Sequence, residues 1–504
     1  MLDMSQGIPG IPPPAMLLDA LGRCASDPQA CGYCSITGEP LLMSALAKEM
    51  KHIYGTDCDL SPDDTALTAG ANMAFTAAIM AVADAGDEVV LPVPWYFNHG
   101  MTLQMMGIIA VPLPTLPHEG FLPSPRKCAE LISTKTKAIV LVSPNNPTGA
   151  IYSPSLIASF ALLARERNIA LIMDETYRDF VTNGVPHHLF VPGPLQPSPD
   201  LPTDWTWRRH FIHLFSFSKS YCIPGHRLGA VVAGADVMEQ IKTVLDCIQI
   251  CAPRHVQLAL YPLLPELRPF IRETAHALVQ RHKLFRSLLP STWELGSQGG
   301  YYAFVKHPFK GISATEVSRR MAVETGIVTL PAGFFMPLNY AITGSTGKDA
   351  DRWIRFSVAN VDDTKVEKVL SRHGRVQSTS EGAILASLTH PSSSTHKKEK
   401  SSKGKGKAVD ADHAMKKSRR NLNKTTTEST LAKLFTSCGP LYQALKLSNV
   451  QLDDCFIVVC PTVDELPEMR RLAEKRAQHY MPKERELCSE STLVAPASER
   501  DAMP

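Results

Sequence analysis

Two short apolar segments separated by one helix place the strongest constraint on how this chain folds. Residues 138–142 and 169–173 have the length and the branched apolar side chains of buried β-strands, and residues 156–167 between them carry a helical pattern. A strand–helix–strand order favours a parallel sheet covered by helices. We therefore expect an α/β fold in which ligands bind at the carboxyl ends of the strands.

Polar residues stand where these strands end. Asn146 follows the first strand, and Asp174 and Tyr177 follow the second. A third apolar run, at 211–215, ends in the same way, with Lys219 shortly beyond it. Because the carboxyl ends of parallel strands meet at one edge of a sheet, we expect these side chains to share one site.

The loop after the third strand has the residues needed to hold one particular cofactor. Ser216 and Ser218 precede Lys219, and a Pro-Gly turn then leads to Arg227. A lysine amine can condense with an aldehyde, while hydroxyls and a guanidinium can bind a phosphate. An aldehyde and a phosphate on one small molecule indicate pyridoxal 5'-phosphate. Taken alone, the loop could also be a solvated surface segment, since lysine is mostly exposed.

Two further segments could contribute to such a site. Gly70, Ala71 and Asn72 lie between a short strand and a helix, so their amides could close on an anion, although small residues there also suit packing alone. Tyr96, in the aromatic segment 94–99 after another strand, could stack on a flat cofactor or belong to a small core. Position alone does not choose between these alternatives.

The composition bounds the class of protein. The 504 residues correspond to about three domain-sized units, and the net charge of +3 indicates no general affinity for nucleic acid or membrane. No apolar run reaches the ~18 residues of a membrane span, and the first residues lack the pattern of a signal peptide. The 12 cysteines are scattered, which favours a reducing compartment, so we expect a cytoplasmic protein.

One cysteine pair resembles a metal or redox motif. Cys31 and Cys34 have the Cys-x-x-Cys spacing, but no second pair of cysteines or histidines stands at a matching distance. A zinc ion needs about four ligands. We therefore expect neither a metal site nor redox chemistry at this motif.

The composition changes beyond Gln377. Ser, Thr, Lys and Gly dominate residues 378–427, and basic clusters lie at 397–400 and 416–420. Such a segment cannot bury enough apolar surface to order itself, so we expect 377–504 to be a largely disordered basic extension. The clusters could also act in nuclear import or contact nucleic acid, but a solvated tail is the favoured interpretation.

Taken together, the motifs resemble those of the class I/II, or fold type I, pyridoxal-phosphate aminotransferases over residues 1–376. The segments that carry the resemblance are Tyr33 with Gly38, 68–72, 94–96, 145–149, 174–177, 216–229 and 353–357. The resemblance implies a large domain with a mostly parallel seven-stranded sheet flanked by helices, and a smaller α+β domain. The implied bounds are 1–40 for an N-terminal segment joining the small domain, 41–263 for the large domain, 264–376 for the small domain and 377–504 for the extension.

The resemblance also implies a role for each candidate residue. Lys219 would be the Schiff-base and proton-shuttle lysine, Asp174 would pair with the pyridine nitrogen, and Arg355 would bind the substrate carboxylate. Tyr177 and Asn146 would hydrogen-bond the ring oxygen, and Tyr96 would stack on the ring. The phosphate would be held by Gly70, Ala71, Asn72, Ser216, Ser218 and Arg227, and by Tyr33 reaching over from a neighbouring subunit. Asn146 and Ile8 would join Arg355 in contacting the substrate.

The implied activity is transfer of an amino group from an L-amino acid to a 2-oxo acid by a ping-pong route, in a homodimer with shared active sites. Lyases of the same fold, such as β-lyases and aminocyclopropane-carboxylate synthases, use the same residues and are the main alternative. A pyridoxal-phosphate-bearing regulator fused to a DNA-binding module is less favoured, because it would need a winged-helix unit ahead of Tyr33, where only about thirty residues stand. Nucleic-acid binding through the tail stays open as an added function.

The start of the chain and the expected pocket bear on assembly and on substrate. Relatives carry an N-terminal arm that often packs on the partner subunit, whereas this chain starts almost at the segment that matches residues 2–9. An apolar and aromatic pocket, which leans towards neutral or aromatic amino acids, is expected from Ile8, Tyr96, Tyr301, Tyr302, Phe334 and Phe335.

Overall fold

The computed structural model describes residues 2–191, 193, 205–337 and 351–366. These residues all belong to the first of two compact units, Met1–Ser402. The extension at 377–504, with its expected disorder and its basic clusters, lies outside the described residues.

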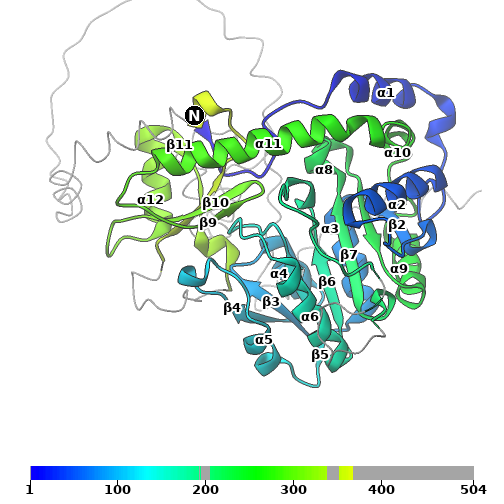
Figure 1. The fold of residues 1–504 in the computed structure, drawn as a ribbon, viewed down its shortest axis with the longest axis horizontal. Coiled ribbons are helices and arrows are strands. Elements are labelled where there is room, and N and C mark those ends of the chain that lie inside the picture. The colour runs from blue at the N-terminus through cyan, green and yellow to red at the C-terminus, as the bar shows by residue number, and fades with distance from the viewer. Residues whose placement is uncertain (1, 192, 194–204, 338–350, 367–504) are drawn as a thin grey trace, which may run out of the picture. The chain divides into compact units, whose positions relative to one another are not determined.

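A seven-stranded sheet forms the centre of this unit (Figure 1). From β7 to β4 every neighbouring pair is parallel, whereas β8 is antiparallel to both of its neighbours. The sheet order β2-β8-β7-β6-β5-β3-β4 confirms the expected mostly parallel α/β fold. The strands are β2 (Thr65–Thr68), β3 (Glu88–Val93), β4 (Ile109–Pro114), β5 (Thr136–Val142), β6 (Ala170–Asp174), β7 (Phe211–Ser216) and β8 (Gly229–Val232).

Alternation along the strands sends successive side chains to two helical layers. In β6, Leu171 and Met173 belong to one buried cluster, while Ile172 belongs to the cluster on the opposite face. The first cluster includes residues of α1 (Ala15–Ala25), α2 (Pro40–Tyr54), α5 (Pro125–Leu131), α6 (Pro154–Arg167) and α10 (Arg254–Leu260). The second includes residues of α3 (Ala71–Val82), α4 (Phe97–Met105) and α9 (Ala235–Ile248). Short helices α7 (Trp207–His210) and α8 (Phe217–Ser220) flank β7.

Local signals fix the helix between β5 and β6. Ser153 caps α6 by accepting a hydrogen bond from the amide of Leu156, and Pro154 occupies its first turn. Asn168 ends the helix in the left-handed conformation, with φ of +52°. The crossover that the sequence predicts therefore begins and ends where its capping residues stand.

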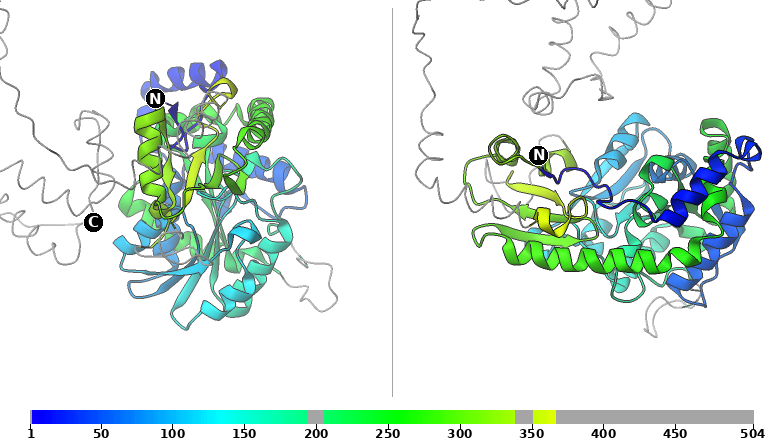
Figure 2. Two further views of the ribbon diagram at one scale, coloured as in Figure 1. Left: turned by 90° about the vertical axis from the view of Figure 1, so that its left-hand side faces the viewer. Right: turned by 90° about the horizontal axis from the view of Figure 1, so that it is seen from above.

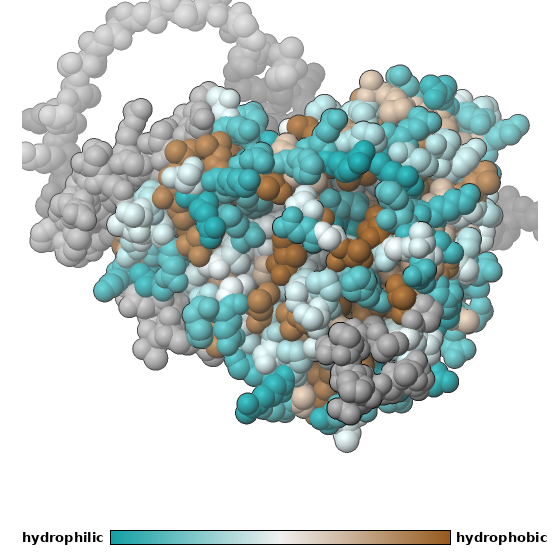
Figure 3. Space-filling model, viewed as in Figure 1, coloured by the Kyte–Doolittle hydropathy of each residue, from teal (hydrophilic) through white to brown (hydrophobic). Residues whose placement is uncertain are grey.

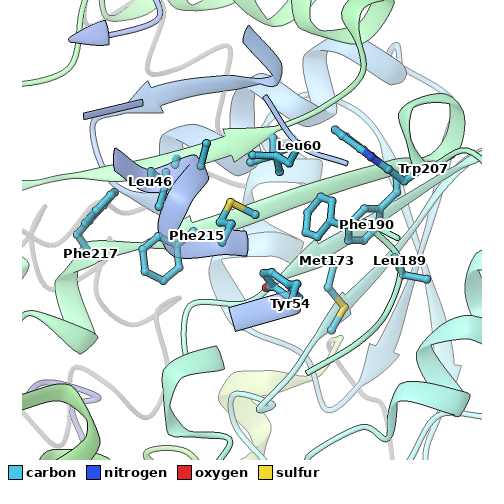
Figure 4. Packing of buried hydrophobic residues seen from close by; sticks show 14 of the residues in the cluster. Leu46, Tyr54, Leu60, Met173, Leu189, Phe190, Trp207, Phe215 and Phe217 are labelled. Atoms are coloured by element: carbon cyan, nitrogen blue, oxygen red, sulfur yellow. The ribbon is translucent and has the colours of Figure 1, made fainter. Parts of the chain in front are cut away.

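Large aromatic side chains fill the first cluster. Figure 4 shows Tyr54, Phe190 and Trp207 in one buried cluster with Met173 of β6 and Phe215 of β7. The rings of Phe190 and Trp207 pack edge to face with their centroids 5.2 Å apart. This dense packing holds the ends of β6 and β7, which carry the predicted site residues.

A second, antiparallel sheet has the order β12-β13-β10-β9. The long helix α11 (Leu264–Leu288) runs from the large sheet to this small one (Figures 1 and 2). Its first turns pack in the large-sheet core and its later turns pack beside Phe356 and Tyr301. The remaining elements are β1 (Leu2–Asp3), β9 (Glu294–Gly299), β10 (Tyr302–Lys306), α12 (Ala314–Arg320), β11 (Ile327–Val328), β12 (Leu330–Pro331) and β13 (Trp353–Ser357).

The N-terminal strand β1 belongs to neither of these two sheets, because it forms a separate two-stranded sheet with β11. β1 pairs in parallel with β11, and Met4 is fully buried in the cluster of the small sheet. The face crossed by α11 carries hydrophilic residues interspersed with hydrophobic ones (Figure 3). Within the described part of the chain, no helix is both long and apolar enough to cross a membrane.

Candidate active site

A cavity of about 350 Å³ opens at the carboxyl ends of the parallel strands. Three neighbouring strands deliver side chains to it, because Asn146 follows β5, Asp174 ends β6 and Ser216 ends β7. Tyr302 of β10 and Arg355 of β13 reach it from the small sheet. The predicted residues that line the cavity are Ile8, Ala71, Asn72, Tyr96, Asn146, Asp174, Tyr177, Ser216, Ser218, Lys219, Arg227 and Arg355.

Lys219 lies in the short helix α8, which begins directly after β7. Its Nζ donates a 2.6 Å hydrogen bond to the carbonyl oxygen of Gly7, in the N-terminal segment. Burial, together with the positive charges of Arg227 and Arg355, lowers the pKa of the Lys219 amine to about 8. An appreciable fraction of the amine is therefore neutral and nucleophilic near neutral pH.

The carboxylate of Asp174 is buried and fully partnered. Its Oδ1 accepts hydrogen bonds from the backbone N of Thr176 at 3.0 Å and from its hydroxyl at 2.7 Å, while Oδ2 lies 3.2 Å from Nε2 of His99. Burial raises the pKa of Asp174, but the hydrogen bond and charge of His99 and the hydrogen bonds of Thr176 outweigh it and leave the pKa lowered. The cavity therefore contains a permanent negative charge at this point.

His99 is a site residue that sequence reasoning missed. It is buried on α4, and its ring stacks on Phe75 of α3 with centroids 4.0 Å apart. The rings of Tyr96 and His99 lie edge to face at 5.1 Å. Their separation of three residues at the start of a helix is the signal that could have placed His99 beside Tyr96.

The start of α3 and the Arg227 turn form one corner of the site. The antiparallel pairing of β2 with β8 sets Thr68 opposite Gly229, which brings Gly70 close to Arg227. Gly70 has φ of +84°, and a Cβ at this position would collide with the Arg227 guanidinium. Asn72 stands in the first turn of α3, where free backbone amides favour an anion.

Two buried serines line the cavity at the end of β7. The hydroxyl of Ser216 accepts a 3.3 Å hydrogen bond from the backbone N of Ser218, at the start of α8. Both residues line the same cavity as Arg227. Hydroxyls, helix-start amides and a guanidinium together suit a phosphate group.

Arg355 is buried in β13, with polar partners on only part of its guanidinium. Nη1 donates to Oδ1 of Asn146 at 2.8 Å, Nη2 donates to the carbonyl oxygen of Ser5, and the buried Nε has no partner. The rings of Tyr302 and Phe335 lie 4.6 and 4.7 Å from its central carbon. Among the described residues no carboxylate forms an ion pair with Arg355, so a buried positive charge remains available for an anion.

Tyrosine hydroxyls meet inside the cavity. The hydroxyls of Tyr177 and Tyr302 are 2.6 Å apart, and burial, followed by the neighbouring Tyr302, raises the pKa of Tyr177. Tyr96 accepts a 2.7 Å hydrogen bond from Asn98 Nδ2, and burial also raises its pKa. All three phenols therefore stay protonated and can donate hydrogen bonds. The sequence suggested Tyr302 only as part of an apolar lining.

Glu175 points to the opposite face of the sheet from Asp174 and belongs to a buried polar cluster. Its Oε2 lies 2.9 Å from Nε2 of His213 and 3.2 Å from Nε2 of His187, and it accepts a hydrogen bond from Tyr54. Burial raises the pKa of Glu175, but the two histidines outweigh it and hold the pKa well below its usual range. This cluster ties β6 to β7 behind the site, and no sequence pattern predicted it.

Tyr33 does not line the cavity of its own chain. It is 77% exposed and borders a separate surface hollow together with Arg254. Arg254 pairs with Glu39 at 2.5 Å and donates to the carbonyl oxygen of Gln29 at 2.8 Å. Arg254 thus has partners within its own chain.

Residues 1–372 match the family described as aminotransferase class I and II. The chain belongs to this family. The resemblance stated from the sequence motifs is thereby confirmed, and the observed sheet order agrees with the expected fold.

Similar proteins support this family assignment. A probable aspartate/prephenate aminotransferase of Thermus aquaticus is 30% identical over 255 residues, which cover 49% of this chain and 62% of that protein, less than two thirds of its length. An aromatic aminotransferase of Arabidopsis thaliana is 28% identical over 341 residues, covering 66% of this chain and 81% of that protein. The solved structure of an aspartate aminotransferase from Thermus thermophilus with maleate shares the fold, with a TM-score of 0.64 at 24% identity, covering 75% of this chain and 91% of that one.

Members of this family use pyridoxal 5'-phosphate, and the residues present here fit it. A buried lysine of lowered pKa suits an aldehyde, and an ionised buried aspartate suits a protonated ring nitrogen. The corner at Gly70, where a Cβ would leave no room beside Arg227, suits a phosphate. The residues of the site therefore suit the aldehyde, the ring nitrogen and the phosphate of the cofactor. In the described part of the chain, no cluster of three or more His, Cys, Asp or Glu side chains could hold a metal ion.

Proposed function

We propose that this protein is an aminotransferase that moves an amino group from an L-amino acid to a 2-oxo acid by a ping-pong route. The observation that carries the proposal is one cavity shared by Lys219, whose pKa is lowered to about 8, and Arg355, whose buried guanidinium has an unpartnered Nε. An α-amino acid offers an amine and a carboxylate, which are the two groups that a reactive-lysine site and a buried arginine suit.

Each residue of the cavity has its own role in the proposed reaction. Bound pyridoxal 5'-phosphate supplies an aldehyde that condenses with amines and a ring that takes up the electrons released at the substrate Cα. Lys219 would hold the cofactor aldehyde, and its Nζ would accept the proton released at the substrate Cα. Asp174 would keep the ring nitrogen protonated. Asn146 and Tyr177 would donate hydrogen bonds to the ring oxygen.

The remaining predicted residues bind and orient. The phosphate is held by Gly70, Ala71, Asn72, Ser216, Ser218 and Arg227. Arg355 binds the substrate carboxylate bidentately, displacing the Ser5 carbonyl oxygen from its Nη2. Tyr96, which lines the cavity near Asp174, would stack on the cofactor ring.

We propose neutral or aromatic amino acids as the preferred substrates. Ile8, Phe97, Leu330 and Tyr302 give the lining an apolar and aromatic character. The cationic side chains that line the cavity among the described residues are Lys219, Arg227 and Arg355, and each already has a role. The second carboxylate of an acidic substrate would need a further cation. The names of the similar proteins include both aspartate and aromatic aminotransferases.

We further propose a homodimer in which Tyr33 reaches the cofactor phosphate of the partner subunit. The exposure of Tyr33, away from its own chain's cavity, supports this role. The same proposal assigns 1–40 to an N-terminal segment, 41–263 to a large domain and 264–376 to a small domain, with active sites between neighbouring subunits. A measurement of the molar mass of the native protein after size separation tests the dimer.

The test of the activity is a single-turnover absorbance experiment. Amino acids are added one at a time to the cofactor-loaded protein without a 2-oxo acid acceptor. We expect the band of the lysine-linked cofactor to disappear as the band of the aminated cofactor grows, most rapidly with phenylalanine, tyrosine or leucine. Lys219→Ala should lose this conversion while it still folds, as judged by its circular dichroism.

Two other outcomes would overturn the proposal. An unchanged lysine-linked band with release of ammonia and an oxo product would make the protein a lyase of the same fold. A protein that takes up no pyridoxal 5'-phosphate would contradict the cofactor assignment as well. Faster conversion with aspartate than with phenylalanine would contradict only the proposed substrate class.

A further inference from the structure

The guanidinium of Arg355 lies over two aromatic rings that come from different segments. Its central carbon is 4.6 Å from the ring centroid of Tyr302 and 4.7 Å from that of Phe335. Tyr302 lines the active-site cavity, as Arg355 does, whereas Phe335 does not line it and is fully buried. Phe335 therefore does not form the pocket wall expected from the sequence, but lies against the arginine from within the protein.

The backbone holds Phe335 in this place from two directions. β12 pairs with β13 so that Leu330 lies opposite Arg355, and the short helical turn Ala332–Phe335 follows β12 directly. The carbonyl oxygen of Phe335 accepts a 2.8 Å hydrogen bond from the backbone N of Trp95, which lies between β3 and α4. The position of the Phe335 ring is thus fixed by contacts to both the small and the large sheet.

Hydrogen bonds alone leave the orientation of the Arg355 guanidinium incompletely fixed. Nη1 donates to Asn146, Nη2 donates to the carbonyl oxygen of Ser5, and the buried Nε has no hydrogen-bond partner. In the proposed reaction the substrate carboxylate displaces the Ser5 oxygen, which leaves Asn146 as the hydrogen-bonding anchor. A guanidinium binds a carboxylate through two parallel hydrogen bonds only when the planes of the two groups are aligned. A cation is attracted to an aromatic face, so the adjacent rings restrict that plane.

We propose that Phe335 is a positioning residue for the substrate carboxylate, because its ring holds the Arg355 guanidinium in the orientation that bidentate binding requires. Phe335 acts only through Arg355, since it does not line the cavity. Tyr302 supplies the second ring, but it also lines the cavity and contacts Tyr177, so its substitution affects more than one contact. The inference rests on the proposed function, in which Arg355 binds the carboxylate of an amino acid.

Loss of the Phe335 ring should weaken carboxylate binding selectively. Phe335→Leu keeps an apolar side chain but removes the aromatic face, so the bound arginine loses part of its preorganisation. We expect the affinity for a carboxylate ligand to fall about tenfold, which is within the range of a desolvated cation–π contact. KM should rise for the amino acid and for the 2-oxo acid with kcat little changed, because the lost contact acts in the ground state and in the transition state alike. The affinity for pyridoxal 5'-phosphate should not change.

The experiment is calorimetric titration of the cofactor-loaded protein with two unreactive ligands. Hydrocinnamate has the carbon skeleton and carboxylate of phenylalanine but no amino group, and hydrocinnamamide has the same skeleton without the negative charge. We expect Phe335→Leu to bind hydrocinnamate about tenfold more weakly and to bind hydrocinnamamide as the natural protein does. A residue that only shaped an apolar pocket would weaken both ligands equally.

Three variants serve as controls. Phe335→Tyr keeps the ring and should retain most of the affinity for hydrocinnamate. Phe285→Leu removes another fully buried ring, which packs on Phe356 beside the small sheet with centroids 5.5 Å apart, and should leave both affinities unchanged. Circular dichroism checks the folding of each variant. Phe335→Met, with an unbranched apolar side chain, replaces Phe335→Leu if the latter does not fold.

The outcomes separate this inference from the proposed function. Unchanged hydrocinnamate binding in Phe335→Leu, together with binding that is lost in Arg355→Lys, would overturn the positioning role alone. An equal fall for hydrocinnamamide, or an equal fall in Phe335→Tyr or in Phe285→Leu, would overturn it as well. Natural protein that does not bind hydrocinnamate, or binding that Arg355→Lys leaves unaltered, would overturn the proposed carboxylate site and this inference with it.

Discussion

The hydroxyls of Tyr177 and Tyr302 lie 2.6 Å apart, although one follows β6 of the large sheet and the other begins β10 of the small sheet. The ring of Tyr302 also lies 4.6 Å from the central carbon of Arg355. A Cβ on Gly7, whose carbonyl oxygen binds Lys219, would collide with the Tyr302 hydroxyl. Tyr302 therefore lies next to Tyr177, to Arg355 and to Gly7, the residue that binds Lys219.

Substitution of Tyr302 should separate these contacts. Tyr302→Phe removes the hydrogen bond to Tyr177, about 1 kcal/mol, so we expect kcat to fall roughly fivefold with KM little changed. Tyr302→Leu also removes the ring beside Arg355, so KM should rise as well. Steady-state kinetics with one amino acid and one 2-oxo acid measure the split. Equal effects of the two substitutions on KM would contradict the role of the ring, and Tyr261→Phe, away from the cavity lining, serves as the control.

Replacing Arg355 by lysine should weaken substrate binding selectively. Lysine keeps the charge but lacks the planar fork that binds a carboxylate bidentately. We expect KM for both the amino acid and the 2-oxo acid to rise by about 10- to 100-fold, as for the loss of about 1.4 to 2.7 kcal/mol of charge-assisted hydrogen bonding. The affinity for pyridoxal 5'-phosphate should not change. Arg352→Lys, just ahead of the same strand, should leave KM unaltered; a similar rise there would point to disturbance of the small sheet.

His99→Gln should shift the acidic limb of the pH–rate profile. Burial alone raises the pKa of Asp174, and His99 is the largest opposing influence, so its loss raises that pKa. A carboxyl group with a raised pKa loses its charge at a higher pH as acid is added. We therefore expect the acidic limb of kcat to move to higher pH, whereas the exposed control His118→Gln should not move it. Profiles that coincide would show that His99 does not govern Asp174.

In the cofactor-free protein, Lys219 should lower stability in a pH-dependent way. Its pKa falls from an ordinary 10.5 to about 8 on folding, so between these values the unfolded chain binds more protons, and stability rises with pH. At about 1.4 kcal/mol per pKa unit, the buried ammonium costs about 3 kcal/mol below pH 8. Lys219→Met should therefore be more stable than the natural chain at pH 7, and the difference should shrink towards pH 10.

Urea unfolding of the two cofactor-free proteins at both pH values tests this expectation. Lys242→Met, a surface substitution on α9, provides the control and should show little dependence on pH. The same difference in the free energy of unfolding between Lys219→Met and the natural chain at pH 7 and at pH 10 would contradict this expectation. It would mean that burial of a charged Lys219 amine does not destabilise the fold.

The residues at strand ends were predictable because the rule that governs them is local. Asn146, Asp174 and Lys219 each follow an apolar run, and the strand–helix–strand order requires parallel strands whose carboxyl ends coincide. The expected sheet and most of the expected cavity lining are found in the structure. The roles of these residues remain predictions until the experiments above are made.

Other contacts depend on segments that meet only in the folded chain. Arg355 lies 209 residues from Asn146, yet the two share a 2.8 Å hydrogen bond, and Gly7 lies 212 residues from Lys219. The contact between His99 and Asp174 requires α4 to pack at one position along β6, and no periodicity in the sequence encodes that position. The Glu175 cluster likewise needs two histidines brought together by strand pairing.

The sequence by itself determined the α/β architecture, the lysine and aspartate at the strand ends and the class of cofactor, because local patterning and side-chain chemistry carry that information. Only the tertiary structure decided which groups tune and support them. The physical reason is that proximity between distant segments follows from the packing of whole helices and strands, which no short stretch of sequence specifies.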